Sequence, residues 1–226
     1  MLFDFSHTLF HIEDAEHALL AALGPDFVHW SDKLRRLGAI NGSSTSEDLP
    51  PHLVEPWDRR DLSAESHRAA YSGLSVHAGL TPDQAHLVYE RGLSPEAWSP
   101  YPDTVAVLRR LHANRIPVAL VSNIGWDPRP VLEAYEVADY FRVLVLSDER
   151  GVIKPAPEIF RQACADLGIR PRRALMVGDN PEADGGAEAI GCLYHWVPAA
   201  VADRRGDELL RAVGLVDPAD ISGGSG

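Results

Sequence analysis

The sequence predicts an α/β fold, in which a doubly wound parallel sheet is interrupted after its first strand by a helical insertion. Short runs rich in Val, Leu and Ile alternate with helical patterns from residue 100 onward. Such alternation is typical of βαβ units with right-handed crossovers and a parallel sheet. Residues 12–99 show helical periodicity without strand-like runs, which indicates a separate helical segment.

The first strand consists of the few residues before Asp4, which makes it unusually short for a buried strand. Four later strands are expected where apolar runs end in small or polar residues, at residues 116–122, 141–147, 173–178 and 192–197. Continuous apolar runs of this length indicate strands that are buried on both faces. Helical patterns lie between them at residues 104–113, 130–135 and 157–167.

The helical insertion is expected to contain four helices, at residues 15–23, 30–37, 64–74 and 82–93. Thr81 before Pro82 is a suitable N-cap for the last of them, and residues 41–51 form a polar loop. Residues 99–102 are the return hinge. We therefore expect an α/β core domain of residues 1–11 and 100–215, a helical domain of residues 12–99, and a C-terminal tail of residues 216–226.

Composition limits the classes of function. The net charge of −12 argues against nucleic-acid or anionic-membrane partners, which attract clustered Lys and Arg. No apolar run approaches the length of a membrane span, and the first residues lack the pattern of a secretory signal. Two cysteines are too few for a disulfide framework. We expect a cytoplasmic protein that acts as a monomer or homodimer.

Polar side chains follow successive predicted strands. They are, in chain order, Asp4, Ser122, Asn123, Lys154, Asp179 and Asp184. In an open parallel sheet, ligands bind outside the carboxyl ends of the strands, near the topological switch point. Each residue alone is ordinary turn chemistry, but carboxylates, a hydroxyl and an ammonium converging on one edge predict an active site.

These motifs resemble those of the haloacid dehalogenase superfamily over nearly the whole chain. The family's four motifs occur in order: Asp4 in DFSHTL, Ser122 in VALVSN, Lys154 in SDERGVIKPAPEIF, and Asp179 with Asp184 in VGDNPEAD. The resemblance implies a Rossmann-like hydrolase core, with residues 12–99 as a cap domain inserted after the first motif.

The resemblance also implies a mechanism and a cofactor. Asp4 would attack phosphorus and form an aspartyl-phosphate intermediate. Mg²⁺ would be held by the Asp4 carboxylate, the backbone carbonyl of Ser6 and Asp179, with Asp184 orienting that shell. Such a site would admit a small phosphorylated substrate into an acidic protein, because the ion inverts the local charge.

Substrate contacts are implied for a second group of residues. Ser122 and Asn123 would bind phosphoryl oxygens through a hydroxyl and backbone N–H groups. Lys154 would neutralise charge on both the nucleophile and the transferring group. His7, where the family usually has Gly, adjoins the same site.

Ser6 departs from the family pattern. Phosphatases of the family carry a second Asp at this position, as acid to the leaving group and later as base to the attacking water. A serine hydroxyl does not titrate near neutral pH, so it lacks this contribution of about 10²–10⁴-fold. Either His7 supplies the proton, or His7 only occupies a turn. If His7 only occupies a turn, two explanations are left. The substrate has a leaving group that needs little protonation, such as an acyl phosphate, or the protein is a slow enzyme or only binds its ligand.

Two other reactions known for this fold are alternatives to phosphate-ester hydrolysis. Carbon–halogen enzymes work without metal and carry an aromatic residue at position 6, so Asp179 and Asp184 argue against that activity. Phosphonate-cleaving relatives have a small residue at position 6 and a cap lysine that forms a Schiff base. Lys33 is the only lysine in residues 12–99, although its neighbouring arginines indicate a solvated helix face. The function expected is therefore a Mg²⁺-dependent phosphatase.

Overall fold

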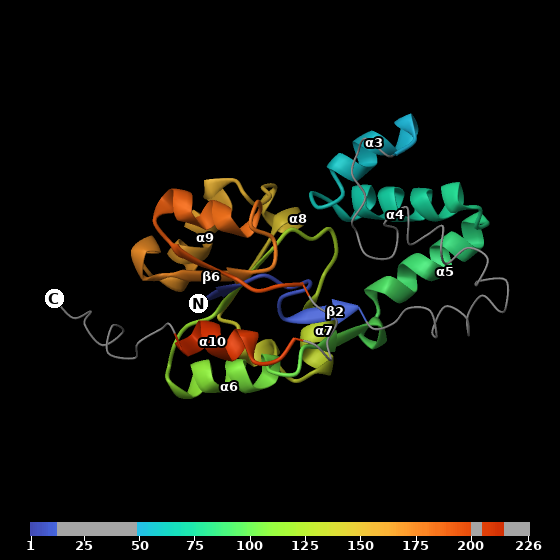
Figure 1. Ribbon diagram of the computed structural model, residues 1–226. Coiled ribbons are helices and arrows are strands. Elements are labelled where there is room, and N and C mark those ends of the chain that lie inside the picture. Colours follow the sequence, from blue (N-terminus) through green and yellow to red (C-terminus); the bar gives the residue numbers. More distant parts are fainter. Residues whose placement is uncertain (13–48, 200–204, 215–226) are drawn as a thin grey trace. The chain divides into compact units, whose positions relative to one another are not determined.

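The computed structural model describes residues 1–12, 49–199 and 205–214 (Figure 1). The chain divides into two compact units. One comprises Met1–His11, Ser99–Asn123 and Leu132–Gly226, and the other Ile12–Trp98 and Ile124–Val131. The helices expected at residues 15–23 and 30–37, Lys33, and the tail at residues 216–226 lie outside the described residues.

The first unit is built on a five-stranded parallel sheet in the order β5-β4-β1-β6-β7. Its strands are β1 (Leu2–Phe3), β4 (Ala119–Ser122), β5 (Val143–Leu146), β6 (Leu175–Gly178) and β7 (Leu193–Trp196). The chain runs outward from β1 to β5 and then returns to the other side of β1 at β6. The switch point of the sheet therefore lies between β1 and β6, where ligands gather in such folds.

Helices cover both faces of this sheet. Figure 1 shows α8 (Ser147–Arg150) and α9 (Pro157–Leu167) on one face, and α6 (Thr104–Ala113) and α10 (Glu208–Gly214) on the other. Ile159 and Phe160 of α9 pack on Leu2 and Met176 in one buried cluster. Each fully buried side chain of this kind stabilises the fold by roughly 1.5–3 kcal/mol. This packing fixes the strand ends that carry the polar residues.

Short helices complete the unit. They are α7 (Arg129–Ala134), which the second unit shares, and the 3₁₀ helices η3 (Ala138–Tyr140), η4 (Pro171–Arg173) and η5 (Asp184–Ile190). The strands β2 (Phe10–Ile12) and β3 (Trp98–Pro100), where the chain passes between the units, pair in a two-stranded sheet.

The described part of the second unit contains α3 (Pro51–Asp58), α4 (Ala64–Ala78), α5 (Pro82–Leu93) and η2 (Pro95–Ala97). Leu53, Trp57 and Leu74 form its buried cluster, against which Tyr71 packs. Thr81 caps α5 as predicted, through a capping box with Gln84. Among the described residues, no helix has the length and apolar character needed to cross a bilayer.

Most predicted elements are present, and the α/β class is confirmed. The helices α5, α6 and α9 have the predicted bounds, whereas the strands are shorter than predicted because pairing extends over four residues at most. Residues 192–197 were expected as a buried strand, but β7 is the edge of the sheet, and Leu193 and Trp196 are largely exposed. The prediction missed the helices α3, α8 and α10, the short strands β2 and β3, and the 3₁₀ helices, among them η5.

Candidate active site

Asp4 lies directly after β1, at the switch point of the sheet. Its backbone N–H donates to the carbonyl of Val177 at 3.0 Å, which continues the ladder between β1 and β6. The carboxylate is buried, and its Oδ1 accepts a hydrogen bond from Ser122 Oγ at the end of β4, at 3.0 Å. Two neighbouring strand ends thus converge on one carboxylate oxygen.

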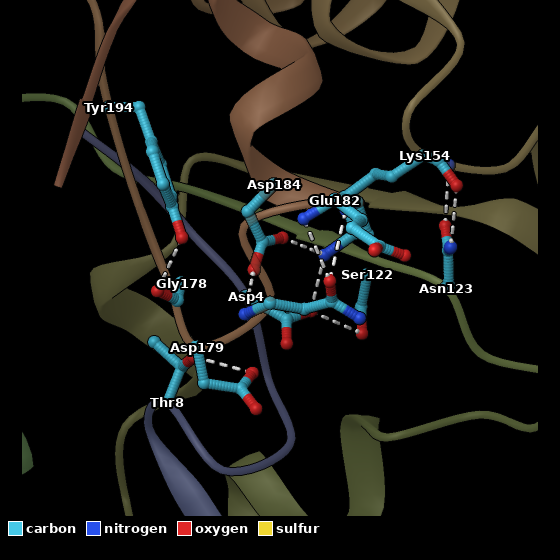
Figure 2. Close-up of polar contacts among 12 residues, drawn as sticks. Asp4, Thr8, Ser122, Asn123, Lys154, Gly178, Asp179, Glu182, Asp184 and Tyr194 are labelled. Carbon is cyan, nitrogen blue, oxygen red and sulfur yellow. Dashed lines mark hydrogen bonds and ion pairs between the residues drawn. The ribbon is translucent and has the colours of Figure 1, made fainter. Parts of the chain in front are cut away.

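Lys154 joins Asp4 to Asp184. Its ammonium Nζ lies 2.7 Å from Asp4 Oδ1 and 2.6 Å from Asp184 Oδ1 (Figure 2). The lysine is 4% exposed. Burial alone would lower its pKa, but the two carboxylates outweigh burial and raise the pKa. The two carboxylates therefore favour the charged form of the lysine beside Asp4.

Asn123 fixes the backbone that carries this lysine. Its Oδ1 accepts from the Lys154 backbone N–H at 2.7 Å, and its Nδ2 donates to the Lys154 carbonyl at 3.0 Å (Figure 2). One amide side chain thus satisfies both backbone groups of a residue 31 positions away. This pairing sets the distance between the end of β4 and Lys154.

Asp184 is held by the loop that follows β6. Its Oδ2 accepts from the backbone N–H of Asn180 at 3.0 Å, and it is fully buried. Gly178 is required for this approach, because a Cβ at that position would overlap the Asp184 carboxyl group. Asp184 therefore presents its other oxygen, Oδ1, to Lys154.

Asp179 lies directly after β6, and neighbouring side chains hold both its carboxylate and the backbone at this strand end. Thr8 Oγ1 donates to Asp179 Oδ1 at 3.4 Å (Figure 2). Two residues of β7 on the same face of the strand donate to successive carbonyls: Tyr194 to Gly178 at 3.2 Å, and Trp196 Nε1 to Asp179 at 3.0 Å. The strand end is thus braced from the edge of the sheet.

The three aspartates form a donor set that fits a hard divalent ion. One carboxylate oxygen each from Asp4, Asp179 and Asp184 lies within 4.8 Å of the others. Burial, with repulsion from Asp4 and Asp184, raises the pKa of Asp179 to about 7, and burial raises that of Asp184. Oxygen ligands of this kind suit Mg²⁺, and a divalent charge would relieve the repulsion that raises these pKa values.

Ser6 and His7 form the turn that follows Asp4. Ser6 is half-buried and makes an isolated bridge to Phe10. His7 has a φ of 56°, as expected of a turn, and burial lowers its pKa although Asp4 opposes the shift. The imidazole of His11 packs on the ring of Tyr101, with centroids 4.9 Å apart. His7 therefore stands in the turn that follows Asp4, whereas the imidazole of His11 contacts Tyr101.

The structure brings together the six residues expected at the strand ends, and it adds some that the sequence did not indicate. Tyr194 and Trp196 are two positions apart on a predicted strand, so it was predictable that they share one face of it. The carbonyls to which they donate were not predictable. Thr8 lies within the first motif, DFSHTL, but nothing in its spacing distinguished it from its neighbours. Arg205, whose guanidinium donates to the carbonyl of His7 at 2.8 Å, lies in a polar stretch with no periodicity.

Comparison with known proteins agrees with this geometry. A sequence model of haloacid dehalogenase-like hydrolases matches residues 1–191. The chain therefore belongs to this family of hydrolases, as its four motifs predicted.

Characterised relatives include phosphatases. A phosphoglycolate phosphatase of Yersinia pseudotuberculosis is 34% identical over 161 residues, which cover 68% of this chain and 69% of that protein. A phosphoserine phosphatase of Thermus thermophilus is 34% identical over 123 residues, covering 53% of this chain. The match spans about half of the latter protein, 49% of its length. Among solved structures, a HAD phosphatase from Thermococcus onnurineus superposes with a TM-score of 0.61 at 25% identity, over 96% of this chain and 97% of that one.

Proposed function

We propose that this hydrolase is a Mg²⁺-dependent phosphatase that cleaves a phosphate monoester of a small metabolite through an intermediate on Asp4. The observation that carries the proposal is the Lys154 ammonium bound to Asp4 and Asp184, with Asp179 completing a cluster of three carboxylates. The carboxylates suit a bound divalent ion, and the ammonium among them suits a negatively charged phosphoryl group.

In the first step, a carboxylate oxygen of Asp4 forms a bond to phosphorus and the bond from phosphorus to the ester oxygen breaks. Lys154 and the Ser122 hydroxyl would stabilise the charge on the transferring phosphoryl oxygens, and the backbone carbonyl of Ser6, Asp4 and Asp179 would hold Mg²⁺. Bound there, the ion would offset phosphoryl charge and fix the line of attack. In the second step, water attacks phosphorus, which releases phosphate and restores the Asp4 carboxylate.

Proton transfer is where this chain would differ from the usual phosphatase. Ser6 can orient water by hydrogen bonding, but its hydroxyl does not titrate near neutral pH. The leaving oxygen must therefore take its proton from elsewhere, with His7 or solvent as the sources open to it. A substrate whose leaving group needs little protonation, such as an acyl phosphate, would suit the site best.

The second unit is proposed to be the cap, which would close over the site and exclude water. The two relatives are named for phosphoglycolate and phosphoserine, so phosphate esters that also carry a carboxylate belong in the first substrate panel. The net charge of −12 disfavours binding to nucleic acids or anionic membranes, which attract clustered Lys and Arg. A cytoplasmic location is part of the same proposal.

The experiment is a measurement of phosphate release from sugar, nucleotide, carboxylate-bearing and acyl phosphates, with Mg²⁺ and with EDTA. Asp4→Asn should abolish release, whereas Asp166→Asn, the same change at an exposed aspartate on α9, should leave it intact. Mg²⁺-independent release, or release that survives Asp4→Asn, would overturn the proposal.

Lys33→Met distinguishes the proposed phosphatase activity from phosphonate cleavage, the alternative activity. Phosphonate cleavage through a Schiff base would end with this variant, and borohydride would trap the substrate on Lys33. The phosphatase proposed here should tolerate the change. If no phosphate ester is hydrolysed and a phosphorylated ligand still binds with Mg²⁺, the protein is a binder instead of an enzyme.

A further inference from the structure

Arg205 is a buried cation that lies beyond the residues matched by the family. Its side chain is 1% exposed, which makes it the largest fully buried side chain of the described residues. The family match ends at residue 191. Burial lowers its pKa, and an arginine that is kept charged in such a place normally has a specific partner.

The contacts of Arg205 point to the turn after the nucleophile. Its Nη1 donates to the backbone carbonyl of His7 at 2.8 Å, across 198 positions of sequence. The face of the guanidinium lies over the ring of Tyr101, 3.7 Å from the ring centroid. A planar cation held on one face by an aromatic ring has a fixed direction for its remaining donors.

The segment that carries Arg205 is itself anchored. Asp103 Oδ2 accepts from the backbone N–H groups of Leu209 and Leu210, at 2.8 and 3.3 Å, and so caps the start of α10. Leu209 is fully buried, and α10 packs on α6. Tyr101 and Asp103 both belong to the stretch that leads from β3 into α6. Arg205 therefore reaches His7 from a segment that Asp103 and α6 hold in place.

The turn at His7 needs such support. A φ of 56° is unfavourable for a residue with a Cβ and persists where surrounding contacts enforce it. The N–H of His7 donates to the Phe10 carbonyl at 2.7 Å, and its carbonyl accepts from Arg205. These two bonds fix the peptide groups on either side of His7, next to the Ser6 carbonyl and to Thr8, which contacts Asp179.

We propose that Arg205 is a positioning residue for the hydrolysis proposed above, on which this inference rests. It holds the turn after Asp4 in its left-handed conformation, and thereby keeps the Ser6 carbonyl and Thr8 aligned with the cluster of carboxylates. Arg205 is accordingly a support of the proposed catalytic site, although it lies outside the four motifs.

The test is a double-mutant cycle between Arg205→Met and His7→Gly, with kcat and KM measured under saturating Mg²⁺. Arg205→Met should lower kcat about 10-fold, as expected for losing a charge-assisted hydrogen bond, with KM changed less than about 2-fold. Glycine adopts positive φ without cost, so in the His7→Gly background the same change should cost less than about 3-fold. Arg211→Met, an exposed arginine on α10, is the matched control and should match wild type.

Calorimetric titration with Mg²⁺ in the absence of substrate supplies a readout separate from turnover. Weaker Mg²⁺ binding by Arg205→Met, restored in part by Arg205→Lys, supports the inference, because lysine keeps the charge and one donor. Equal losses of kcat in both backgrounds, or a lowered melting temperature with unchanged kcat and Mg²⁺ affinity, would overturn it. Where Arg205→Met does not fold, Arg205→Gln, which also removes the charge, takes its place in the cycle with the same criteria.

The two proposals fail in different ways. If wild type hydrolyses no phosphate ester but its Mg²⁺ affinity still depends on Arg205 and His7 in the coupled manner described, the proposed function fails, while the part of the inference that concerns the carboxylate cluster stands. If wild type is an active phosphatase and Arg205→Met keeps its kcat and Mg²⁺ affinity, the positioning role alone fails.

Discussion

Replacing Lys154 with methionine removes the ammonium whose Nζ lies 2.7 Å from Asp4 Oδ1 and 2.6 Å from Asp184 Oδ1. Methionine keeps most of the volume of the stem, so the change isolates the charge. The lysine side chain is 3% exposed and that of Asp184 is 0% exposed, so water cannot replace the lost partner. Leaving a buried charge unpaired costs about 3–5 kcal/mol of stability.

The size of the effect should depend on pH. The pKa of Lys154 is raised, so in wild type its ion pairs with Asp4 and Asp184 are kept at neutral pH. In the variant, Asp184 loses the cation that opposes the rise of its pKa through burial, so its folded pKa lies further above that of the unfolded chain. The cost is absent while this carboxyl group is protonated in both the folded and the unfolded state, and it grows as pH rises. Destabilisation should therefore be larger at about pH 8 than at about pH 5.

The assay combines urea unfolding at both pH values, in EDTA, with phosphate release under saturating Mg²⁺. We expect kcat to fall by roughly 10²–10³-fold, the usual loss when a group that stabilises developing charge is removed. Lys33→Met, the same substitution at the only other lysine, should keep kcat. A Lys154→Met variant with wild-type stability at the higher pH, or with kcat within about 3-fold of wild type, would refute the reasoning.

Two further predictions concern proton transfer and the carboxylates. Ser6→Asp should raise kcat at least about 10-fold for esters with poor leaving groups, because it adds the missing acid; an unchanged or lower kcat contradicts this. The raised folded pKa of Asp179, about 7, means that ionising this carboxylate destabilises the folded protein. In EDTA, the free energy of unfolding of wild type should therefore fall relative to that of Asp179→Asn as pH rises from about 4 to about 7, and the difference should level off above that pH. Mg²⁺ should remove this fall in stability, and a free energy of unfolding that instead rises for wild type relative to Asp179→Asn over this range would contradict the prediction.

The strand ends were predictable because parallel strands bring their carboxyl ends to one edge of a sheet. That rule, with the order of the motifs, was enough to expect Asp4, Ser122, Asn123 and Lys154 as neighbours. The helices α5, α6 and α9 carry strong local signals, such as the capping box at Thr81, and their bounds were predicted correctly.

The missed helices lack such signals. The start of α10 is held by Asp103, which lies more than a hundred residues earlier, and this contact leaves no mark in the helix's own sequence. In α3, prolines at two positions suggest a loop, and only the i, i+4 pair of Leu53 and Trp57 is buried on the helix. Tertiary contacts that stabilise a short helix leave little trace in its own sequence.

The bracing of the site was equally hidden. Arg205 contacts His7 only because α10 packs on α6, and no rule of spacing relates two residues that far apart. Tyr194 and Trp196 reach the carbonyls of Gly178 and Asp179 because β7 pairs with β6, and a strand pattern does not specify its neighbour. The sequence thus indicated the candidate groups for the chemistry, whereas the structure shows which residues hold those groups in place.

The most direct test of the central claim is the fate of water oxygen in a single turnover on Asp4. With excess enzyme, Mg²⁺ and a hydrolysable phosphate ester in heavy-oxygen water, hydrolysis of an aspartyl phosphate by attack on phosphorus should place the label in phosphate. The Asp4 peptide should stay unlabelled, and hydroxylamine added during turnover should convert Asp4 to a hydroxamate. Label incorporated into the Asp4 carboxylate, or turnover without any adduct on Asp4, would contradict the account.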